Sequence, residues 1–274
     1  MADIQDILPL KTGGIVSLTG AGGKTSVMFH LAAGLSDAGK KVLTTTTTKI
    51  YPPLPLQSET IILSNSTDEL LEKASVIIRN KNHITAASAL IRKENKLKGF
   101  STEMIHQIQQ SNFFDWILIE ADGAAQRLLK APAEHEPVIP VNTDIWIGVA
   151  GLDVIDKPLV ESIVFRPELV SQITGLPIGK PIGESHLATL ALHPLGFLKN
   201  VPTKAIRCFF LNKADNKKAM DSGRKIVNQI KDMESGQLNA VVIGEAQNKL
   251  IVHDWFFFKA FPKDQPPLPK AHTG

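Results

Sequence analysis

The sequence predicts an α/β fold, in which a mostly parallel β-sheet lies between two layers of helices and carries a helical insertion. Short apolar segments alternate with amphipathic helical segments along most of the chain, which is typical of parallel sheets covered on both faces. A glycine-rich segment separates the first apolar segment from the first helix, and a later apolar segment ends in carboxylates. Ligands bind at the carboxyl ends of parallel strands, so both features predict a site at that edge.

The length of 274 residues predicts one domain rather than two. We expect this domain to span residues 1–262, with the insertion at about 151–202. Residues 263–274 are rich in proline and polar side chains and are predicted to form a disordered tail. The composition, 43% hydrophobic and 21% charged, is that of an ordinary soluble protein.

Charge and cysteine content exclude several classes of protein. The net charge of +3 and the lack of basic runs interleaved with aromatic residues argue against nucleic acid as a partner. Cys208 is the only cysteine, which excludes an internal disulfide and a Cys-rich zinc site and fits a reducing compartment. The chain has neither a signal-peptide pattern nor an apolar run of about 18 residues, so we expect a cytoplasmic protein without a membrane partner.

The first half of the chain predicts alternating strands and helices. Strands are expected at residues 15–19, 42–47 and 60–63, and helices at 24–38, 67–79 and 102–110. In the first helix Met28, Leu31 and Leu35 lie on one face, and Gly39 is a suitable end. Residues 83–98 are less regular and predict a pair of strands joined at 93–95.

The second half continues the alternation. Buried strands are expected at residues 116–119, 145–150 and 205–211, and a last strand at 240–243. A helix is expected at 217–233. The intervening insertion is interrupted by proline and glycine, and its pattern predicts helices without indicating a chemical role.

The central motif is a predicted phosphate-binding loop between the first strand and the first helix. We expect a nucleotide to bind Gly20, Ala21, Gly22, Gly23, Lys24, Thr25 and Ser26. Glycines let backbone N–H groups approach phosphate oxygens, and the helix directs its positive end at the same anion. Lys24 is expected to reach the β- and γ-phosphates, and Thr25 to bind Mg²⁺. This order of elements predicts a P-loop NTPase-like three-layer sandwich.

The loop departs from the usual G-x-x-x-x-G-K-[ST] pattern, because the first position falls on Leu18. Residues 19–25, TGAGGKT, are closer to the T-G-x-x-G-K-T loops of Mur-type ligases and some metallochaperone GTPases. The alternative is a glycine-rich turn without a ligand, which the order of strand, glycines, Lys-Thr and amphipathic helix disfavours.

The acidic end of the strand at 116–119 is the second motif. Glu120 and Asp122 alternate with Ala121 and therefore share a face of an extended strand. One carboxylate is expected to hold Mg²⁺ and the other to orient an attacking water, so Lys24, Glu120 and Asp122 are the predicted catalytic residues. The alternative is that these acids only cap the strand.

Residues 211–215, LNKAD, follow a predicted buried strand and match the Asn-Lys-x-Asp pattern of guanine recognition. We expect Asn212, Lys213 and Asp215 to bind the base, because the Asp carboxylate can accept hydrogen bonds from N1–H and the exocyclic amine of guanine. The alternative is a helix N-cap turn beginning at Asp215.

Two further segments are candidates for the site. The threonine run at 44–48 ends in a loop, where Thr47, Thr48 or Lys49 is expected to sense the γ-phosphate or its Mg²⁺, with Thr47 as the candidate ligand. Arg127 and Lys130 are candidates for neutralising phosphate charge. The acids and histidine of residues 134–136 lack the spacing of a helical metal site and are interpreted as a loop that contacts substrate.

Taken together, the motifs at residues 19–25, 45–49, 120–124, 135–137 and 148–153 resemble those of the YqeC family over roughly residues 10–245. The resemblance implies an accessory protein that uses a nucleotide while a selenium-dependent molybdenum hydroxylase matures. It also implies that this hydroxylase or its cofactor-maturation proteins are partners. The sequence offers no cysteine besides Cys208 to carry selenium, and a direct role with selenium stays open.

Three functions are therefore compared. The first is a GTP- or ATP-hydrolysing accessory protein with Mg²⁺, which the phosphate loop, acidic strand end and Asn-Lys-x-Asp motif favour. The second is an ATP-dependent small-molecule ligase or kinase, which the Mur-like loop favours. The third is a module that binds nucleotide without hydrolysing it.

Overall fold

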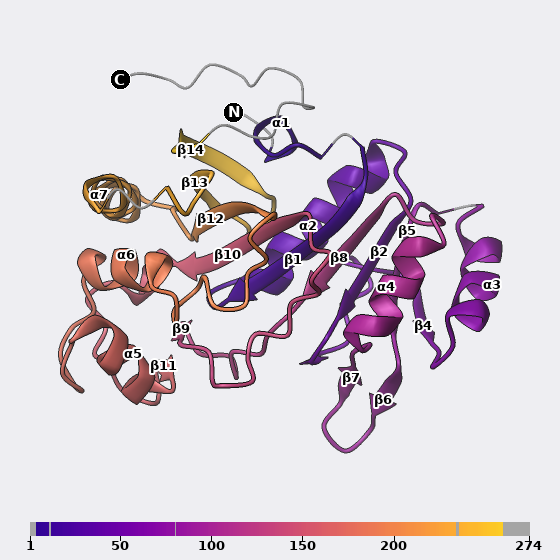
Figure 1. The fold of residues 1–274 in the computed structure, drawn as a ribbon, viewed down its shortest axis with the longest axis horizontal. Coiled ribbons are helices and arrows are strands. Elements are labelled where there is room, and N and C mark those ends of the chain that lie inside the picture. The colour runs from indigo at the N-terminus through magenta and orange to yellow at the C-terminus, as the bar shows by residue number, and fades with distance from the viewer. Residues whose placement is uncertain (1–3, 11, 80, 234–235, 260–274) are drawn as a thin grey trace.

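The computed structural model describes residues 4–10, 12–79, 81–233 and 236–259. Nine strands form one sheet in the order β14-β13-β12-β10-β1-β8-β2-β5-β4 (Figure 1). All neighbouring pairs in this sheet are parallel except β13 and β14. Its strands are β1 (Gly14–Gly20), β2 (Val42–Thr46), β4 (Ile61–Leu63), β5 (His83–Ala87), β8 (Trp116–Glu120), β10 (Ile145–Gly151), β12 (Ile206–Asn212), β13 (Ala240–Glu245) and β14 (Ile251–Phe257). The predicted α/β fold class is confirmed.

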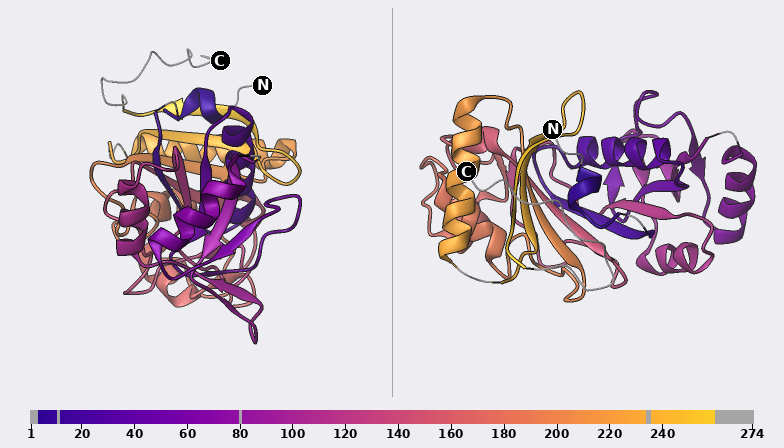
Figure 2. Two further views of the ribbon diagram at one scale, coloured as in Figure 1. Left: turned by 90° about the vertical axis from the view of Figure 1, so that its right-hand side faces the viewer. Right: turned by 90° about the horizontal axis from the view of Figure 1, so that it is seen from above.

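Helices cover both faces of this sheet (Figure 2). One apolar core contains α1 (Ile4–Ile7) and α2 (Lys24–Asp37). The helices of the other core are α3 (Thr67–Ile77), α4 (Thr102–Gln110), α5 (Pro167–Thr174), α6 (Glu184–Leu192) and α7 (Lys217–Asp232). Successive residues of one strand point to opposite faces of the sheet: Ile15 packs in the core with α3–α7, and Val16 packs in the core with α1 and α2.

Helix α2 begins without a side-chain cap, unlike α3, α4 and α7. The side chains of Ser66, Ser101 and Asn216 cap α3, α4 and α7 by accepting a backbone N–H hydrogen bond. Gly23 occupies the same position before α2 and offers no side chain, so the N–H groups of the first turn are not satisfied by a cap. The positive end of this helix therefore points into the edge of the sheet where β1 ends.

The irregular segments differ in detail from the prediction. Residues 83–98 form three strands instead of two: β5 joins the main sheet, while β6 (Ala89–Ile91) and β7 (Lys96–Lys98) form a hairpin. That hairpin pairs with β3 (Lys49–Ile50) in a separate small sheet, which projects from the main one (Figure 1).

Several short elements were not predicted. They are α1, the antiparallel edge strand β14, the turn η1 (Leu152–Val154), and the pair β9 (Leu129–Lys130) and β11 (Val164–Phe165). The pair β9–β11 ties the loop after β8 to the insertion, which also contains α5 and α6. The predicted disordered tail, 263–274, lies outside the described residues. Within the described ranges, no helix is both long and apolar enough to cross a bilayer.

Candidate functional site

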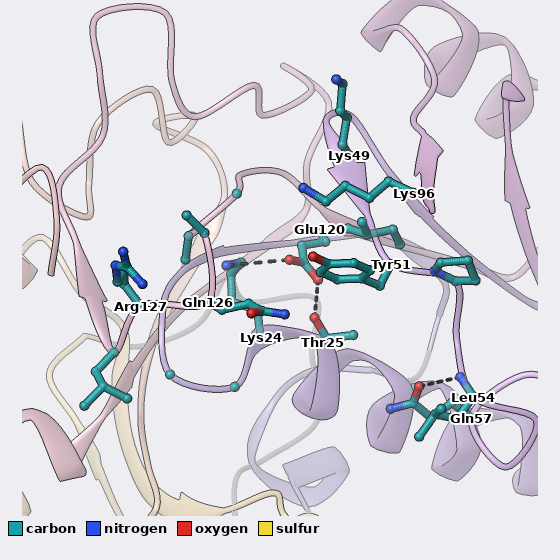
Figure 3. Close-up of a pocket in the computed structure, with 18 of the residues that line it drawn as sticks. Lys24, Thr25, Lys49, Tyr51, Leu54, Gln57, Lys96, Glu120, Gln126 and Arg127 are labelled. Carbon is teal, nitrogen blue, oxygen red and sulfur yellow. Dashed lines mark hydrogen bonds and ion pairs between the residues drawn. The ribbon is translucent and has the colours of Figure 1, made fainter. Parts of the chain in front are cut away.

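A cavity of about 690 Å³ opens at the carboxyl ends of the central strands. One part of its wall is the phosphate loop, and the opposite part is the small sheet and the segment that follows β3 (Figure 3). Charged groups lining it are five basic side chains and one acidic one, namely Lys24, Lys49, Lys96, Arg127, Lys213 and Glu120. The excess of positive charge favours an anionic ligand.

The phosphate loop, residues 19–25, has a backbone that only glycine fits at three positions. Gly20, Gly22 and Gly23 have φ values of 102°, 79° and 123°. A Cβ at Gly22 would collide with the backbone of Gly151, and one at Gly23 with the side-chain amide of Asn212. The loop is therefore packed against the ends of β10 and β12, which fixes its shape.

Lys24 lies on the floor of the cavity and is almost fully buried. Its Nζ donates to the carbonyl of Gly20 at 2.8 Å and forms ion pairs with Glu120 Oε1 at 3.6 Å and Asp122 Oδ1 at 3.3 Å. Burial alone would lower the pKa of Lys24, but the two carboxylates outweigh it and raise that pKa. Lys24 is thus a fixed cation.

Thr25 and Glu120 present oxygens side by side. The Thr25 hydroxyl donates to Glu120 Oε2 at 2.7 Å, and both residues line the cavity (Figure 3). A hydroxyl oxygen and a carboxylate oxygen are the ligands that Mg²⁺ prefers. These two residues consequently fit a hard divalent cation beside the phosphate loop.

Asp122 begins a chain of alternating charges that continues away from the cavity, and its inner members Asp122 and Lys130 are buried. Its Oδ2 accepts from the N–H of Gly20 and lies 3.1 Å from Nζ of Lys130. Nζ of Lys130 also donates to Glu136 at 2.8 Å, and Glu136 receives both Nη1 and Nη2 of Arg166, at 2.8 and 3.2 Å. Arg166 directly precedes α5, so the chain connects the phosphate loop with the insertion.

The electrostatics of this chain hold Glu136 ionised. Partial burial alone would raise the pKa of Glu136, but the hydrogen bonds and charges of Arg166 and Lys130 outweigh it and lower that pKa to about 2. Lys130 is 1% exposed, so its charge is balanced by Asp122 and Glu136 instead of water. Lys130 was a candidate for neutralising phosphate charge, but its ammonium contacts these two carboxylates and the carbonyl of Gly123.

The residues of the Asn-Lys-x-Asp segment point in different directions, some toward the phosphate loop and cavity and one toward solvent. Asn212 is buried and donates from Nδ2 to the carbonyl of Gly22 at 2.8 Å. Lys213 lines the cavity and forms an ion pair with Asp153 at 2.6 Å. Asp215 is exposed, does not line the cavity, and accepts a hydrogen bond from Asn216, the N-cap residue of α7.

The structure does not bring Thr47 or Ser26 to the cavity wall. The Thr47 hydroxyl donates to the carbonyl of Val138 at 2.7 Å. Thr44, Thr45 and Thr46 are fully buried in β2, where their hydroxyls bond to neighbouring strands. Most of the threonine run therefore serves the sheet.

Residues 134–136 and Cys208 do not line the cavity. Glu134 and His135 are exposed, while Glu136 turns inward to Lys130 and Arg166. Over the part of the chain that the structure describes, no three His, Cys, Asp or Glu side chains gather as a metal site. Cys208 is fully buried in β12, and burial raises the pKa of its thiol to about 12.

The far wall of the cavity was not predicted beyond Lys49. It contains Tyr51, Pro52, Leu54 and Gln57 from the segment after β3, and Lys96 from β7. Nζ of Lys96 lies 5.2 Å above the ring of Tyr51. The only signal in the sequence is that basic and aromatic side chains stand next to the prolines of residues 49–57.

Known proteins resemble this chain at two levels. The sequence model of the YqeC protein family matches residues 16–168. An uncharacterized YqeC protein of Escherichia coli K12 is 36% identical over 212 residues, which are 77% of this chain and 80% of that protein.

Two solved structures resemble the fold at 14% identity each. The MinC:MinD cell division complex of Aquifex aeolicus has a TM-score of 0.41, with 86% of this chain and 82% of that chain covered. Chloroplast FtsY of Physcomitrella patens has a TM-score of 0.43, with 89% of this chain and 63% of that chain covered.

Proposed function

Since this chain belongs to the YqeC family, we propose that it is a nucleotide-dependent accessory protein for the maturation of a selenium-dependent molybdenum hydroxylase. It binds a nucleoside triphosphate, GTP or ATP, with Mg²⁺. The observation that carries the nucleotide assignment is the uncapped first turn of α2, which faces the same cavity as the buried cation Lys24.

The phosphates are assigned to the loop from Gly20 to Thr25. The N–H groups of Gly20 and Ala21 already donate to Asp122 and to the carbonyl of Val149, so the donors assigned to phosphate oxygens are the N–H groups from Gly22 into the first turn of α2. Lys24 already carries its charge through its pairs with Glu120 and Asp122, so a phosphate can exchange for part of that pairing without a proton being moved.

Mg²⁺ is assigned to Thr25 and Glu120, whose oxygens lie 2.7 Å apart. When bound, the ion would draw negative charge from the phosphates. Asp122 holds the N–H of Gly20 and the ammonium of Lys130, so we assign it to fixing the shape of the loop and the position of Lys24. Hydrolysis by the protein alone or with its partner is part of the proposal, with Lys24 and Glu120 as the catalytic residues and Asp122 as a positioning residue.

The base is assigned to the segment after β12. Asn212 holds the phosphate loop through Gly22, and Lys213 lines the cavity. Recognition of guanine would require Asp215 to turn from its exposed position toward the base. Binding of ATP makes no demand on Asp215, so both nucleotides are part of the proposal and the titration decides the preference.

A second candidate function is an ATP-dependent ligase or kinase acting on a small molecule. The T-G-x-x-G-K-T loop favours it. So does the continuation of the cavity beyond the phosphate loop, as far as Tyr51 and Gln57.

The role in hydroxylase maturation rests on what membership of the family implies. Cys208 supports a role exerted through the nucleotide, because the only thiol in the sequence is buried and protonated. Direct transfer of selenium by this chain would need an accessible thiolate.

Calorimetric titration of GTP and ATP with Mg²⁺ tests the nucleotide assignment. Lys24→Ala removes the buried cation and is expected to weaken binding by about 100-fold or more, the scale of a charge-assisted hydrogen bond in a desolvated site. Lys73→Ala, which breaks an exposed pair on α3 away from the cavity, is the control and should bind normally.

Unchanged affinity in Lys24→Ala would refute the site. The same titrations with Asp215→Asn separate the two candidate functions. Loss of a GTP preference favours the accessory GTPase, and an unaltered preference for ATP favours the ligase or kinase. Phosphate release measured with and without the partner hydroxylase separates hydrolysis from binding alone.

A further inference from the structure

The cavity extends on both sides of the phosphate loop. In the sheet, β12 lies two places from β1 on one side, and β2 lies two places from β1 on the other. The end of β12 provides Asn212 and Lys213, while the chain after β2 leads into β3 and Tyr51. A nucleotide whose base lies toward β12 therefore leaves the end beside Tyr51 free.

The free end has its own anion-binding groups. Lys49 and Lys96 line it, and Figure 3 shows them with Tyr51 on the side of Glu120 away from Arg127. The one carboxylate in the cavity wall, Glu120, is already engaged by Lys24 and Thr25. The pair of Lys49 with Glu94 is about half exposed and contributes little. Lys96 interacts electrostatically with the same exposed Glu94, and its ammonium lies over the Tyr51 ring.

Apolar surface accompanies these cations. Tyr51 is 49% exposed and Leu54 64% exposed, and both line the cavity together with Ile50 and Pro52. Such large exposed apolar side chains beside fixed charges are typical of a ligand site with an apolar body and a polar anchor.

We propose that this end of the cavity binds a second ligand, a small organic anion with an apolar or aromatic body. Its anionic group lies between Lys49 and Lys96, and its body contacts Tyr51 and Leu54. This proposal rests on the proposed function, because this end of the cavity stays free only if the nucleotide binds at the phosphate loop with its base toward β12. A cavity, rather than a flat surface, favours a small molecule over a protein partner.

Phenyl phosphate is a suitable probe because it combines an aromatic ring with an anionic group. Its binding to the full chain is measured by calorimetry in the presence of saturating Mg²⁺ and a non-hydrolysable nucleotide, so that the phosphate loop is blocked. Benzyl alcohol, which has the ring without the charge, is the ligand control.

The double variant Lys49→Met/Lys96→Met is expected to weaken phenyl phosphate binding by about tenfold or more while nucleotide affinity stays within about twofold. Lys98→Met changes an exposed lysine on the same strand that does not line the cavity, and it should bind phenyl phosphate normally. Thermal unfolding of each variant verifies that it is folded.

Two results would overturn the proposal. One is that phenyl phosphate does not bind the wild-type protein, which leaves the exposed Tyr51–Leu54 surface for a protein. The other is an equal loss of nucleotide affinity in the double variant, because both lysines would then hold the nucleotide's own phosphates. If nucleotide itself fails to bind the wild-type protein, the nucleotide assignment is refuted. The second-ligand site is still supported if phenyl phosphate binds the Lys24→Ala protein normally but binds the double variant weakly.

Discussion

Gly22 and Gly39 have the same backbone conformation in very different surroundings. Both have a φ of 79°, but a Cβ would meet the backbone of Gly151 at Gly22 and open space at Gly39. Alanine at Gly39 therefore measures the free-energy cost of a left-handed conformation alone, whereas alanine at Gly22 adds the cost of a collision in the phosphate loop.

Gly39→Ala is expected to lower the free energy of unfolding by about 1 kcal/mol, the cost of a left-handed alanine, and to leave nucleotide binding intact. Gly22→Ala adds a collision with the end of β10, so it should destabilise more and weaken nucleotide binding by about tenfold or more. Urea denaturation and calorimetry measure the two effects. Equal behaviour of both variants would show that the loop relaxes freely.

His83 gives the stability of the sheet a dependence on pH. It lies in β5, within hydrogen-bond distance of the Thr44 hydroxyl, and burial lowers its pKa from 6.5 to about 4. Between these values the unfolded chain binds a proton that the folded chain does not, so stability falls as the pH decreases from about 6.5 to about 4.

The loss is at most about 3 kcal/mol, from 1.36 kcal/mol per pKa unit. His83→Gln removes this proton uptake, so the variant should lose less stability than the wild type over the same range. Urea denaturation at pH 7 and pH 5 measures the difference. Parallel losses in both proteins would assign the pH dependence to other groups.

At the scale of elements, the buried charges hold the insertion against the phosphate loop. Lys130 comes from β9, Arg166 from the beginning of α5, and Glu136 from the loop between β9 and β10. Removing Lys130 leaves Asp122 and Glu136 without their shared cation in a desolvated place.

Lys130→Met is therefore expected to lower the free energy of unfolding by about 3–5 kcal/mol, as found when one partner of a buried pair is removed. The exposed pair of Lys218 with Asp156 is the control, and Lys218→Met should leave the denaturation midpoint almost unchanged. Similar midpoints for the two variants would mean that the buried chain does not stabilise the insertion.

The elements that sequence predicts well are those with strong periodicity or polar caps. The helices predicted at 67–79 and 102–110 are α3 and α4, which the side chains of Ser66 and Ser101 cap, and the apolar strands β8 and β10 are where continuous hydrophobic runs predict them. The edge strand β14 mixes His253 and Asp254 with aromatic residues, so it has neither a continuous apolar run nor a strict alternation. The two-residue strands β9 and β11 are too short to have a period and depend on tertiary contacts.

At the scale of the whole molecule, the site is assembled from segments far apart in the chain. Lys24 follows β1, Glu120 ends β8, and Asn212 ends β12, and all approach one loop. Each of these three residues is predicted to lie at the end of a strand, because the motifs that contain them are formed by residues adjacent in the sequence. It does not predict that Thr47 turns to Val138, that Asp215 faces solvent, or that Lys96 joins the cavity, since these depend on strand order and loop paths.

The floor and the rim of the cavity differ in how far water and dissolved ions reach. Lys24 on the floor is 5% exposed, whereas the side chain of Lys49 on the rim is 49% exposed. Ions in solution screen exposed charges over a Debye length of about 8 Å at physiological ionic strength, but they screen buried pairs much less. The floor of the cavity thus keeps its electrostatic character as ionic strength changes, while the rim responds to it. Added salt should therefore weaken the binding of an anion at the rim more than the binding of phosphate at Lys24.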